Sequence, residues 1–508
     1  MYNTYHTRQD REDAVFSARA EDWRFGPIVY QVIVDRFAPS TDLAKKRHHY
    51  QAPKTLRSWN ELPRSGKFLP ESGVWSHEID YWGGDLNSLA DRLGHIAKLG
   101  ANVLYLNPIH SAFTNHKYDA TDYLQISPEY GTEADLLNLI DKTHNLGMHI
   151  MLDGVFNHVG VQNPIYLAAI SDPQNQYREW FTFDNRYSRG VGLWYNAPNL
   201  PELRYENPAV KEYIYKDHNS VIRHYLRLGI DGWRLDTAFE FGYSVLSEMT
   251  EAAHHEQPNS VMIGEILNYP QDWFPAIDGI MNFTFRQILL QTLLGVIPPQ
   301  QAAKMVQRSI DDAGIEPILR SWLVLENHDT PRLANLLPEP WQQQMARVLQ
   351  FTLPGAPNLY YGAEAGMAGG EDPENRAPMR WDLITEDNPY WQRLQNLISL
   401  RKQHPALRIG EYRSLVSEKL LAFERYTNKV SETILVLCNP GDEDIEEMIL
   451  VPDSRLMNAT EFRPVYGSQH PIQIHSGLIL ANVPRHSINV LQPITQISDS
   501  YTPYKRMP

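Results

Sequence analysis

A short apolar run at residues 232–236 ends in charged residues whose spacing suits chemistry. Its sequence is GWRLD, and in a β-strand Arg234 and Asp236 would point to the same face, because side chains two positions apart share a face. An opposite charge within about 4–6 Å lowers a carboxyl pKa by roughly 1–3 units, so we expect Asp236 to stay ionised. A carboxylate held as an anion can act as a nucleophile. A structural Arg–Asp pair at the end of a strand is the alternative.

The same arrangement, an apolar run followed by polar residues, recurs along the chain. Such runs precede Asn157 and His158, Glu265, and the pair His328 and Asp329. In a (β/α)8 barrel the C-terminal ends of the strands meet at one face, where the active sites of such enzymes lie. We therefore expect three carboxylates, one arginine and two histidines to face one pocket. Charges that merely decorate a surface would be scattered instead.

Two carboxylates on either side of a bond are sufficient to cleave a glycoside. One acts as nucleophile or base, and the other, with a raised pKa, acts as the acid. Asp236 beside Arg234 is the better anion. Glu265 has no cation in its adjacent sequence, so an apolar environment would raise its pKa toward the range of a proton donor. The sequence leaves open whether the two groups are about 5–5.5 Å apart, as in retaining enzymes, or wider apart, as in inverting enzymes.

Eight apolar runs alternate with segments of helical periodicity, which predicts a parallel sheet. Eight such units favour a closed (β/α)8 TIM barrel with insertions over an open doubly wound sheet. Helices are expected at 86–99, 133–146, 208–228 and 389–404. The expected strands are 27–36, 103–106, 150–152, 232–236, 261–265, 279–282, 322–326 and 358–361.

Three long segments interrupt or follow this pattern. Residues 38–81 are too long for a connector and are typical of a binding loop or lid, and the Gly-, Glu- and Pro-rich segment 362–382 indicates an active-site loop. A Tyr- and Trp-rich stretch after the third strand predicts a small inserted domain, and short strands after the last helix predict an all-β C-terminal domain. The domains are an N-terminal extension (1–26), the catalytic barrel (27–404, with inserted domain 159–206) and a C-terminal β-sandwich domain and tail (405–508).

Composition limits the classes of function. The 508 residues are 42% hydrophobic and 21% charged, as in a soluble globular protein with two or three domains. The net charge of −15 argues against a nucleic-acid partner, because phosphate binding needs clustered Lys and Arg. No run of 18 apolar residues and no secretory signal is visible, so we expect no membrane association. The single cysteine, Cys438, excludes an internal disulfide, and we predict a cytoplasmic location.

Four ordered motifs resemble those of the α-amylase family of glycoside hydrolases (family 13), and in detail they look most similar to the neopullulanase and cyclomaltodextrinase branch. The motifs are DGVFNH at 153–158, GWRLDTAFE at 232–240, GEIL at 264–267 and ENHDTPR at 326–332. The resemblance covers about residues 27–493. It implies a retaining double displacement, in which Asp236 is the nucleophile, Glu265 the acid/base and Asp329 the stabiliser of the distorted sugar and transition state.

The resemblance also assigns substrate-binding residues. It implies that Tyr118 stacks under the sugar in the cleaved subsite. His158, Arg234 and His328 would hold that sugar or orient the nucleophile. The implied substrate is an α-glucan or oligosaccharide, and we expect no nucleic-acid or membrane partner.

Several positions depart from the common pattern of the family. Glu240 replaces a histidine whose backbone binds a structural calcium in secreted α-amylases, and the neopullulanase branch shares this glutamate. We therefore expect no required cofactor, assign no metal ligand and regard calcium as the one candidate ion. Phe239, Leu267 and Asn268 lie where the family shapes its acceptor subsites, while Thr237 is seen in members that select α-1,4 bonds. Only about 26 residues precede the first strand, where many cyclomaltodextrinases carry a β domain that builds their dimer, so the oligomeric state is left open.

The expected function is hydrolysis of α-glucosidic bonds, mainly α-1,4, in malto-oligosaccharides, cyclodextrins or starch-like glucans. One alternative is a glucanotransferase or isomerase on the same scaffold, in which a sugar instead of water resolves the glycosyl-enzyme. A second alternative is a non-catalytic carbohydrate-binding homologue. The three carboxylates argue against it, because such homologues lose them.

Overall fold

A closed barrel of eight parallel strands forms the centre of the protein. The computed structural model describes residues 2–467, 470–498 and 501–507. Strands form at all eight predicted places, and the last of them pairs with the first to close the barrel. The first strand is shorter than the predicted 27–36, because Val34–Phe37 form the helix α2. In chain order they are β1 (Val29–Val32), β6 (Val103–Leu106), β9 (His149–Gly154), β10 (Gly232–Leu235), β11 (Val261–Ile266), β12 (Gly279–Asn282), β13 (Trp322–Val324) and β14 (Ala356–Tyr360).

The interior of the barrel is packed with side chains. Tyr105, Met151, Met281 and Trp322 are among the buried residues of one apolar cluster that fills the space between the strands. The strands read as continuous apolar runs because helices cover their outer faces and this cluster fills the inside. The register of β10 places Arg234 between Asp153 on β9 and Ile263 on β11, which decides the neighbours of the arginine.

The helices around the barrel follow the predicted periodicity with two breaks. Helices α6 (Glu133–Asn145) and α16 (Pro389–Gln403) are confirmed, whereas residues 86–99 form two short helices. Residues 208–228 form α8 (Pro208–Lys211), a π-helical turn at Glu212–Lys216 and α9 (Val221–Leu228). The second break lies at Asp217, whose side chain accepts the N–H of Asn219 at 2.7 Å. A side chain that bonds locally to the backbone competes with the helix and ends it. The remaining helices near the barrel are α2 (Val34–Phe37), α4 (Leu86–Ala90), α5 (Leu93–Leu99), α8 (Pro208–Lys211), α9 (Val221–Leu228), α10 (Gly242–Glu256), α11 (Phe283–Leu293), α12 (Pro299–Ala313), α13 (Ile315–Arg320), α14 (Leu333–Leu336), α15 (Pro340–Thr352) and α17 (Pro405–Ile409).

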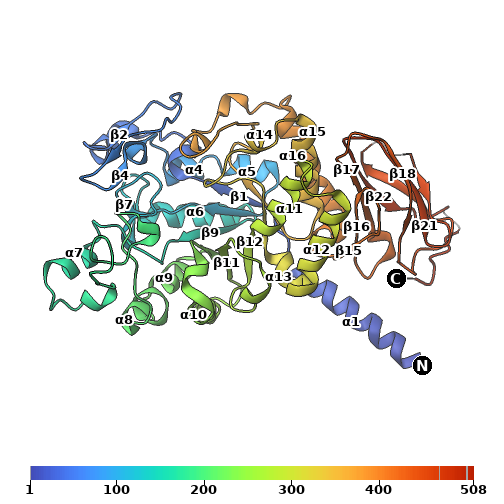
Figure 1. Cartoon of the computed structure of the whole chain (residues 1–508), viewed down its shortest axis with the longest axis horizontal. Coiled ribbons are helices and arrows are strands. Elements are labelled where there is room, and N and C mark those ends of the chain that lie inside the picture. Colours follow the sequence, from blue (N-terminus) through green and yellow to red (C-terminus); the bar gives the residue numbers. More distant parts are fainter. Residues whose placement is uncertain (1, 468–469, 499–500, 508) are drawn as a thin grey trace.

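An N-terminal helix, α1 (Tyr2–Glu21), was not predicted from the sequence. It projects from the body of the molecule beside α13 (Figure 1). Its C-terminal end is fixed by Arg19, which is buried and lies 2.7 Å from Glu316 and 2.8 Å from Glu411. This arginine joins the extension to the barrel and to the first strand of the C-terminal domain.

Three excursions cover the face of the barrel opposite the C-terminal domain (Figure 1). The inserted domain contains α7 (Pro164–Ser171) and is otherwise loop-like, as predicted. The segment 38–81, predicted as a loop, contains α3 (Leu43–Lys46), the parallel pair β2 (Thr55–Leu56) and β5 (Asp80–Tyr81), and the hairpin of β3 (Phe68–Leu69) and β4 (Val74–Trp75). A further hairpin, β7 (His110–Ala112) and β8 (Ala120–Ile126), follows β6.

The C-terminal domain is all-β, as predicted. A six-stranded sheet, in the order β15-β16-β17-β22-β19-β20, packs against the two-stranded sheet β18-β21 over a separate apolar core. The sequence-based reading missed β15, β19, β20 and β22. The strands are β15 (Glu411–Ser414), β16 (Leu421–Tyr426), β17 (Ile434–Asn439), β18 (Ile445–Leu450), β19 (Glu461–Tyr466), β20 (Ile472–Gln473), β21 (Leu478–Val483) and β22 (Ser487–Pro493). The exact residue boundaries between domains stay predictions.

Candidate active site

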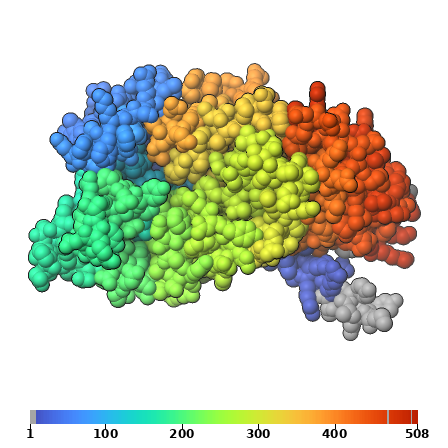
Figure 2. Space-filling view, in the orientation of Figure 1, coloured from blue at the N-terminus to red at the C-terminus, as the bar shows by residue number. Residues whose placement is uncertain are grey.

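A cavity of 780 Å³ opens at the C-terminal ends of the barrel strands. Its walls come from the barrel, the inserted domain and the segment 38–81, and Figure 2 shows the blue lobe of that segment adjoining the green lobe of the inserted domain. Five of the seven predicted site residues line it, and the other two, Arg234 and His328, lie directly behind and contact them. The five are Tyr118, His158, Asp236, Glu265 and Asp329.

Arg234 connects the carboxylates at the base of the cavity. Its guanidinium is 0% exposed, and Nη1 donates to Asp236 Oδ1 at 2.9 Å and to Asp153 Oδ1 at 2.8 Å. Its Nη2 lies 3.0 Å from Glu265 Oε1. The expectation of an apolar environment around Glu265 does not account for this arginine, because the adjacent sequence does not reveal that β10 and β11 pair side by side.

The electrostatics of Asp236 also differ from the prediction. Burial raises the pKa of Asp236 well above its usual value, and the neighbouring carboxylates of Glu265, Asp153 and Asp329 raise it further. Arg234 opposes this increase but does not cancel it. The expected lowering by an adjacent arginine holds for an isolated pair, whereas here one arginine is shared among several carboxylates in a buried site.

A strained turn follows the strand that carries Asp236. Thr237 has a φ of +42°, in the left-handed region that a β-branched residue rarely adopts. In this conformation its backbone N–H donates to Glu265 Oε2 at 3.0 Å. The turn therefore fixes the second oxygen of Glu265 while Arg234 contacts the first.

Asp329 reaches the cavity from the loop after β13. Its side chain is 43% exposed and lies 3.0 Å from His328 Nε2 and 3.3 Å from Arg376 Nη2. The pKa of Asp329 is raised to about 7 by loss of hydration around the carboxyl group and by the negative charge of Glu265. The positive charges of Arg376 and Arg234 oppose this increase. Asp329 thus accepts a hydrogen bond from Arg376, lies beside His328 and remains open to a ligand.

The rings of Tyr118 and His328 stack parallel to each other beside the cavity. Their ring centroids are 5.4 Å apart with an interplanar angle of 3°, and the Tyr118 hydroxyl bonds to His328 Nε2. Burial and nearby arginines lower the pKa of His328 well below its usual value, so the ring is neutral. Gln31 Nε2 donates to His328 Nδ1 at 2.9 Å, which assigns the ring proton to Nε2. This nitrogen therefore donates to the Tyr118 hydroxyl, which in turn donates to Asp153 Oδ2 at 3.0 Å.

His158 forms the opposite part of this wall. Its Nε2 donates to the backbone oxygen of Tyr118 at 3.1 Å, and its ring stacks on Trp194 of the inserted domain at 5.3 Å. Burial lowers the pKa of His158 to about 4. It is therefore neutral near pH 7 and acts by hydrogen bonding and shape.

Several residues of the site carried no role in the sequence-based reading. Asp153 belongs to a recognised motif, but its bonds to Arg234 and to the Tyr105 and Tyr118 hydroxyls become visible only in the fold. Asp372 and Arg376 come from the segment 362–382, whose composition had indicated an active-site loop. Among the other cavity residues without a sequence signal of their own are Phe68, Trp75, Glu78, Trp194, Phe283 and Arg286.

The described residues contain no group of three or more His, Cys, Asp or Glu side chains arranged to hold a metal ion. Glu202 and Glu240, with Asn157, line a separate cavity of 390 Å³ beside the inserted domain. Burial and the negative charge of Glu240 raise the pKa of Glu202, and a hydrogen bond with the Asn157 side chain opposes this increase. That catalysis requires no cofactor stays a prediction.

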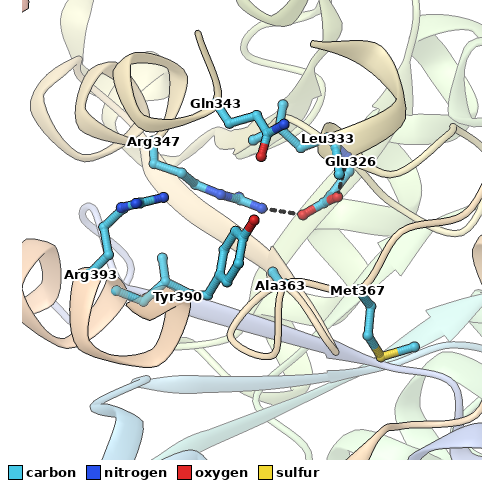
Figure 3. A pocket seen from close by; sticks show the side chains of 11 residues that line it. Glu326, Leu333, Gln343, Arg347, Ala363, Met367, Tyr390 and Arg393 are labelled. Carbon is cyan, nitrogen blue, oxygen red and sulfur yellow. Dashed lines mark hydrogen bonds and ion pairs between the residues drawn. The ribbon is translucent and has the colours of Figure 1, made fainter. Parts of the chain in front are cut away.

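A smaller cavity lies behind the loop after β13 (Figure 3) and is unsuited to a sugar. Its volume is 30 Å³, room for about one water molecule. The buried ion pair of Glu326 and Arg347 crosses it, and Tyr390 and Arg393 reach it from α16. We interpret it as part of the structural core.

Comparison with known proteins agrees with this geometry. Residues 31–392 match the alpha amylase catalytic domain. The chain is 33% identical over 371 residues to a cyclomaltodextrinase of Bacillus sp. (70% of this chain, 66% of the relative) and 30% identical over 487 residues to neopullulanase 2 of Thermoactinomyces vulgaris (91% and 78%). It thus spans about two thirds of the length of that cyclomaltodextrinase. The debranching enzyme of Nostoc punctiforme has a similar structure, with a TM-score of 0.78 and 25% identity over 92% of this chain and 98% of that one.

No helix among the described residues is long and apolar enough to cross a membrane. The barrel, the inserted domain, the four sequence motifs and the matched catalytic domain lead to one conclusion. The chain belongs to the α-amylase family of glycoside hydrolases.

Proposed function

We propose that the protein is a retaining glycosidase that cleaves α-glucosidic bonds, mainly α-1,4, in malto-oligosaccharides, cyclodextrins or starch-like glucans. The observation that supports this most is the convergence of Asp236, Glu265 and Asp329 on one cavity, with Arg234 in contact with the first two. Three carboxylates far apart in the chain have no structural reason to share a solvent-filled cavity. Two of them can supply the nucleophile and the acid/base that a double displacement requires.

In this mechanism Asp236 attacks the anomeric carbon while Glu265 transfers a proton to the oxygen of the leaving sugar. The C–O bond to the leaving group breaks and a covalent glycosyl-enzyme forms. Glu265, now ionised, takes a proton from water, and the water oxygen attacks the anomeric carbon and releases Asp236. The reaction needs Asp236 as the anion and the proton on Glu265. The contact of Asp236 with Arg234 at 2.9 Å favours the ionised form of Asp236.

The other cavity residues would act on the sugar. Asp329, held by His328 and Arg376, would accept hydrogen bonds from hydroxyl groups of the sugar that is attacked. Tyr118 offers its ring as a stacking surface, and His158 closes the wall beside it. None of these steps needs a cofactor, and we propose that none is used.

The test is a product profile on maltotriose, β-cyclodextrin, pullulan, soluble starch and trehalose. We expect release of glucose or maltose from the α-1,4-linked substrates, and the product formed first should have the α configuration by NMR. Asp236→Asn and Glu265→Gln are expected to lower kcat by at least 10³-fold. Wild-type activity no greater than that of Asp236→Asn on every substrate would refute the proposal.

A glucanotransferase is the second candidate, and the wall near Glu265 favours it. Leu267 is 56% exposed and lines the cavity, as do Phe239 and Phe283, so apolar side chains are available to contact an acceptor sugar. Such a surface binds a sugar face better than water. Products longer than the substrate, dominant at high maltotriose concentration, would indicate transfer; their absence would indicate hydrolysis.

We also propose a cytoplasmic location for the protein. The support is the chemistry of its one cysteine, Cys438, which is buried in β17 and has no partner for a disulfide. Fractionation of the source cells with an antibody against the protein would test this location.

A further inference from the structure

The hairpin β3–β4 contributes two aromatic side chains to the cavity wall. Phe68 and Trp75 are 39% and 48% exposed, and their rings meet edge to face at 5.6 Å. Singly exposed apolar residues are common, but two adjacent rings at a cavity wall form a surface suited to the apolar face of a sugar. No step of the proposed mechanism uses them.

The hairpin rests on the inserted domain. Gly73, at the turn, has a φ of +72°, and a Cβ atom at this position would lie 3.5 Å from Pro198 and 3.6 Å from Asn199. The loop 194–200 that carries these residues is held by Trp194 N–H to Leu200 O at 2.9 Å and Ala197 N–H to Trp194 O at 2.8 Å. The two lobes that adjoin in Figure 2 are therefore in contact across this side of the cavity.

A continuous set of contacts shows which end of the cavity the hairpin closes. The backbone N–H of Trp75 donates to Glu78, whose Oε1 lies 3.3 Å from His116 Nε2. The His116 ring in turn stacks near Tyr118, with centroids 5.7 Å apart. The hairpin thus lies on the side of Tyr118, beyond the sugar that is attacked.

The leaving sugar must lie on the other side. The acid has to reach the oxygen of the cleaved bond, so the leaving group is next to Glu265, where Leu267, Phe283 and Arg286 form the wall. In an α-1,4-glucan the attacked sugar continues toward the non-reducing end. The hairpin therefore faces the non-reducing part of the substrate.

On the basis of the proposed function, we propose that the β3–β4 hairpin ends the cleft on the non-reducing side of the cleaved bond. Only a few glucose units fit between the hairpin and the carboxylates, so the enzyme acts on short oligosaccharides and chain ends instead of the interior of long glucans. The cavity volume of 780 Å³ agrees with this, since it lies in the range of about 300–1,000 Å³ of sites that enclose small molecules.

The test removes the wall and leaves its base. Lys67 and Ser76 lie side by side at the base of the hairpin, because Ser76 N–H donates to Lys67 O at 2.8 Å and Lys67 N–H donates to Ser76 Oγ at 3.0 Å. Residues 68–75 can therefore be replaced by a Gly-Gly link that joins Lys67 to Ser76. We expect the ratio of kcat/KM on soluble starch to that on maltotriose to rise at least tenfold. Iodine staining of starch should also fall faster per reducing end released. The control is Leu62→Ala, which changes a 60% exposed residue of the same segment outside the cavity.

The results for the shortened variant and the wild type distinguish failure of this proposal from failure of the proposed function. If the shortened variant turns over maltotriose but its ratio of kcat/KM on starch to that on maltotriose is unchanged, the proposal that the hairpin ends the cleft is refuted. If the wild type turns over no α-glucan, the proposed function is refuted. If thermal unfolding shows that the shortened variant is not folded, Phe68→Ala/Trp75→Ala replaces it. This double variant should raise the same ratio at least threefold, and an unchanged ratio would again overturn the proposal.

Discussion

Replacement of Arg234 by lysine tests the electrostatic core of the site. Lysine keeps the positive charge but concentrates it in one ammonium group, whereas the guanidinium contacts Asp153, Asp236 and Glu265 at 2.8, 2.9 and 3.0 Å. A single ammonium cannot keep all three distances. At least one carboxylate is then about 2 Å farther from the charge, and the geometry of β10 makes Asp236, two residues away on the same strand, directly sensitive to this change.

The size of the effect follows from Coulomb's law. At an effective dielectric constant of about 20, an ion pair weakens by roughly 2 kcal/mol when its separation grows from about 3 to about 5 Å. This loss raises the pKa of Asp236 further, because the cation that favours its ionised form is farther away. It lowers kcat/KM by about 30-fold if the same energy is lost in the transition state.

The assay is the pH profile of kcat/KM on maltotriose. We expect the acidic limb of the profile for Arg234→Lys to move to higher pH, with a roughly 30-fold lower maximum. Arg413→Lys, which makes the same chemical change at the Glu424 pair of the C-terminal domain, is the control and should leave the profile unchanged. An acidic limb at the wild-type position in a folded Arg234→Lys variant would refute the reasoning.

Three further predictions follow from the same structure. Asp329→Asn removes a negative charge that raises the pKa of Asp236, so the acidic limb of its residual kcat/KM profile should move to lower pH; a move upward would contradict the assignment. Burial lowers the pKa of His110 to about 3, so below pH 6.5 the unfolded chain binds a proton at this residue that the folded chain does not, and the free energy of unfolding falls as the pH falls. In urea titrations, His110→Phe should therefore reduce the loss of unfolding free energy between pH 7.5 and 5 by about 2 kcal/mol. The control His48→Phe, at an exposed residue, should leave that loss unchanged. Leu437→Ala, in the core of the C-terminal domain, should cost about 2–5 kcal/mol of stability by calorimetry and leave kcat at 25 °C unchanged; a matching loss of kcat would show that the two domains are coupled.

The sequence by itself determined the barrel strands and the identity of the site. Each barrel strand is an apolar run between turn residues, a pattern that burial on both faces imposes locally, and the charged residues that follow the runs are readable one by one. Because parallel strands of a barrel end at the same face, the convergence of Asp236, Glu265 and Asp329 followed from their positions alone.

Only the tertiary structure decided how the charges are shared and where the cavity ends. Arg234 contacts Glu265 because β10 and β11 pair, and the pKa of Asp236 is raised because several carboxylates are buried together; neither relation is encoded in neighbouring residues. Likewise, Gly73 meets Pro198 across more than a hundred residues of chain. Contacts between segments far apart in the chain set electrostatic energies and cavity shape, and local sequence patterns carry no record of them.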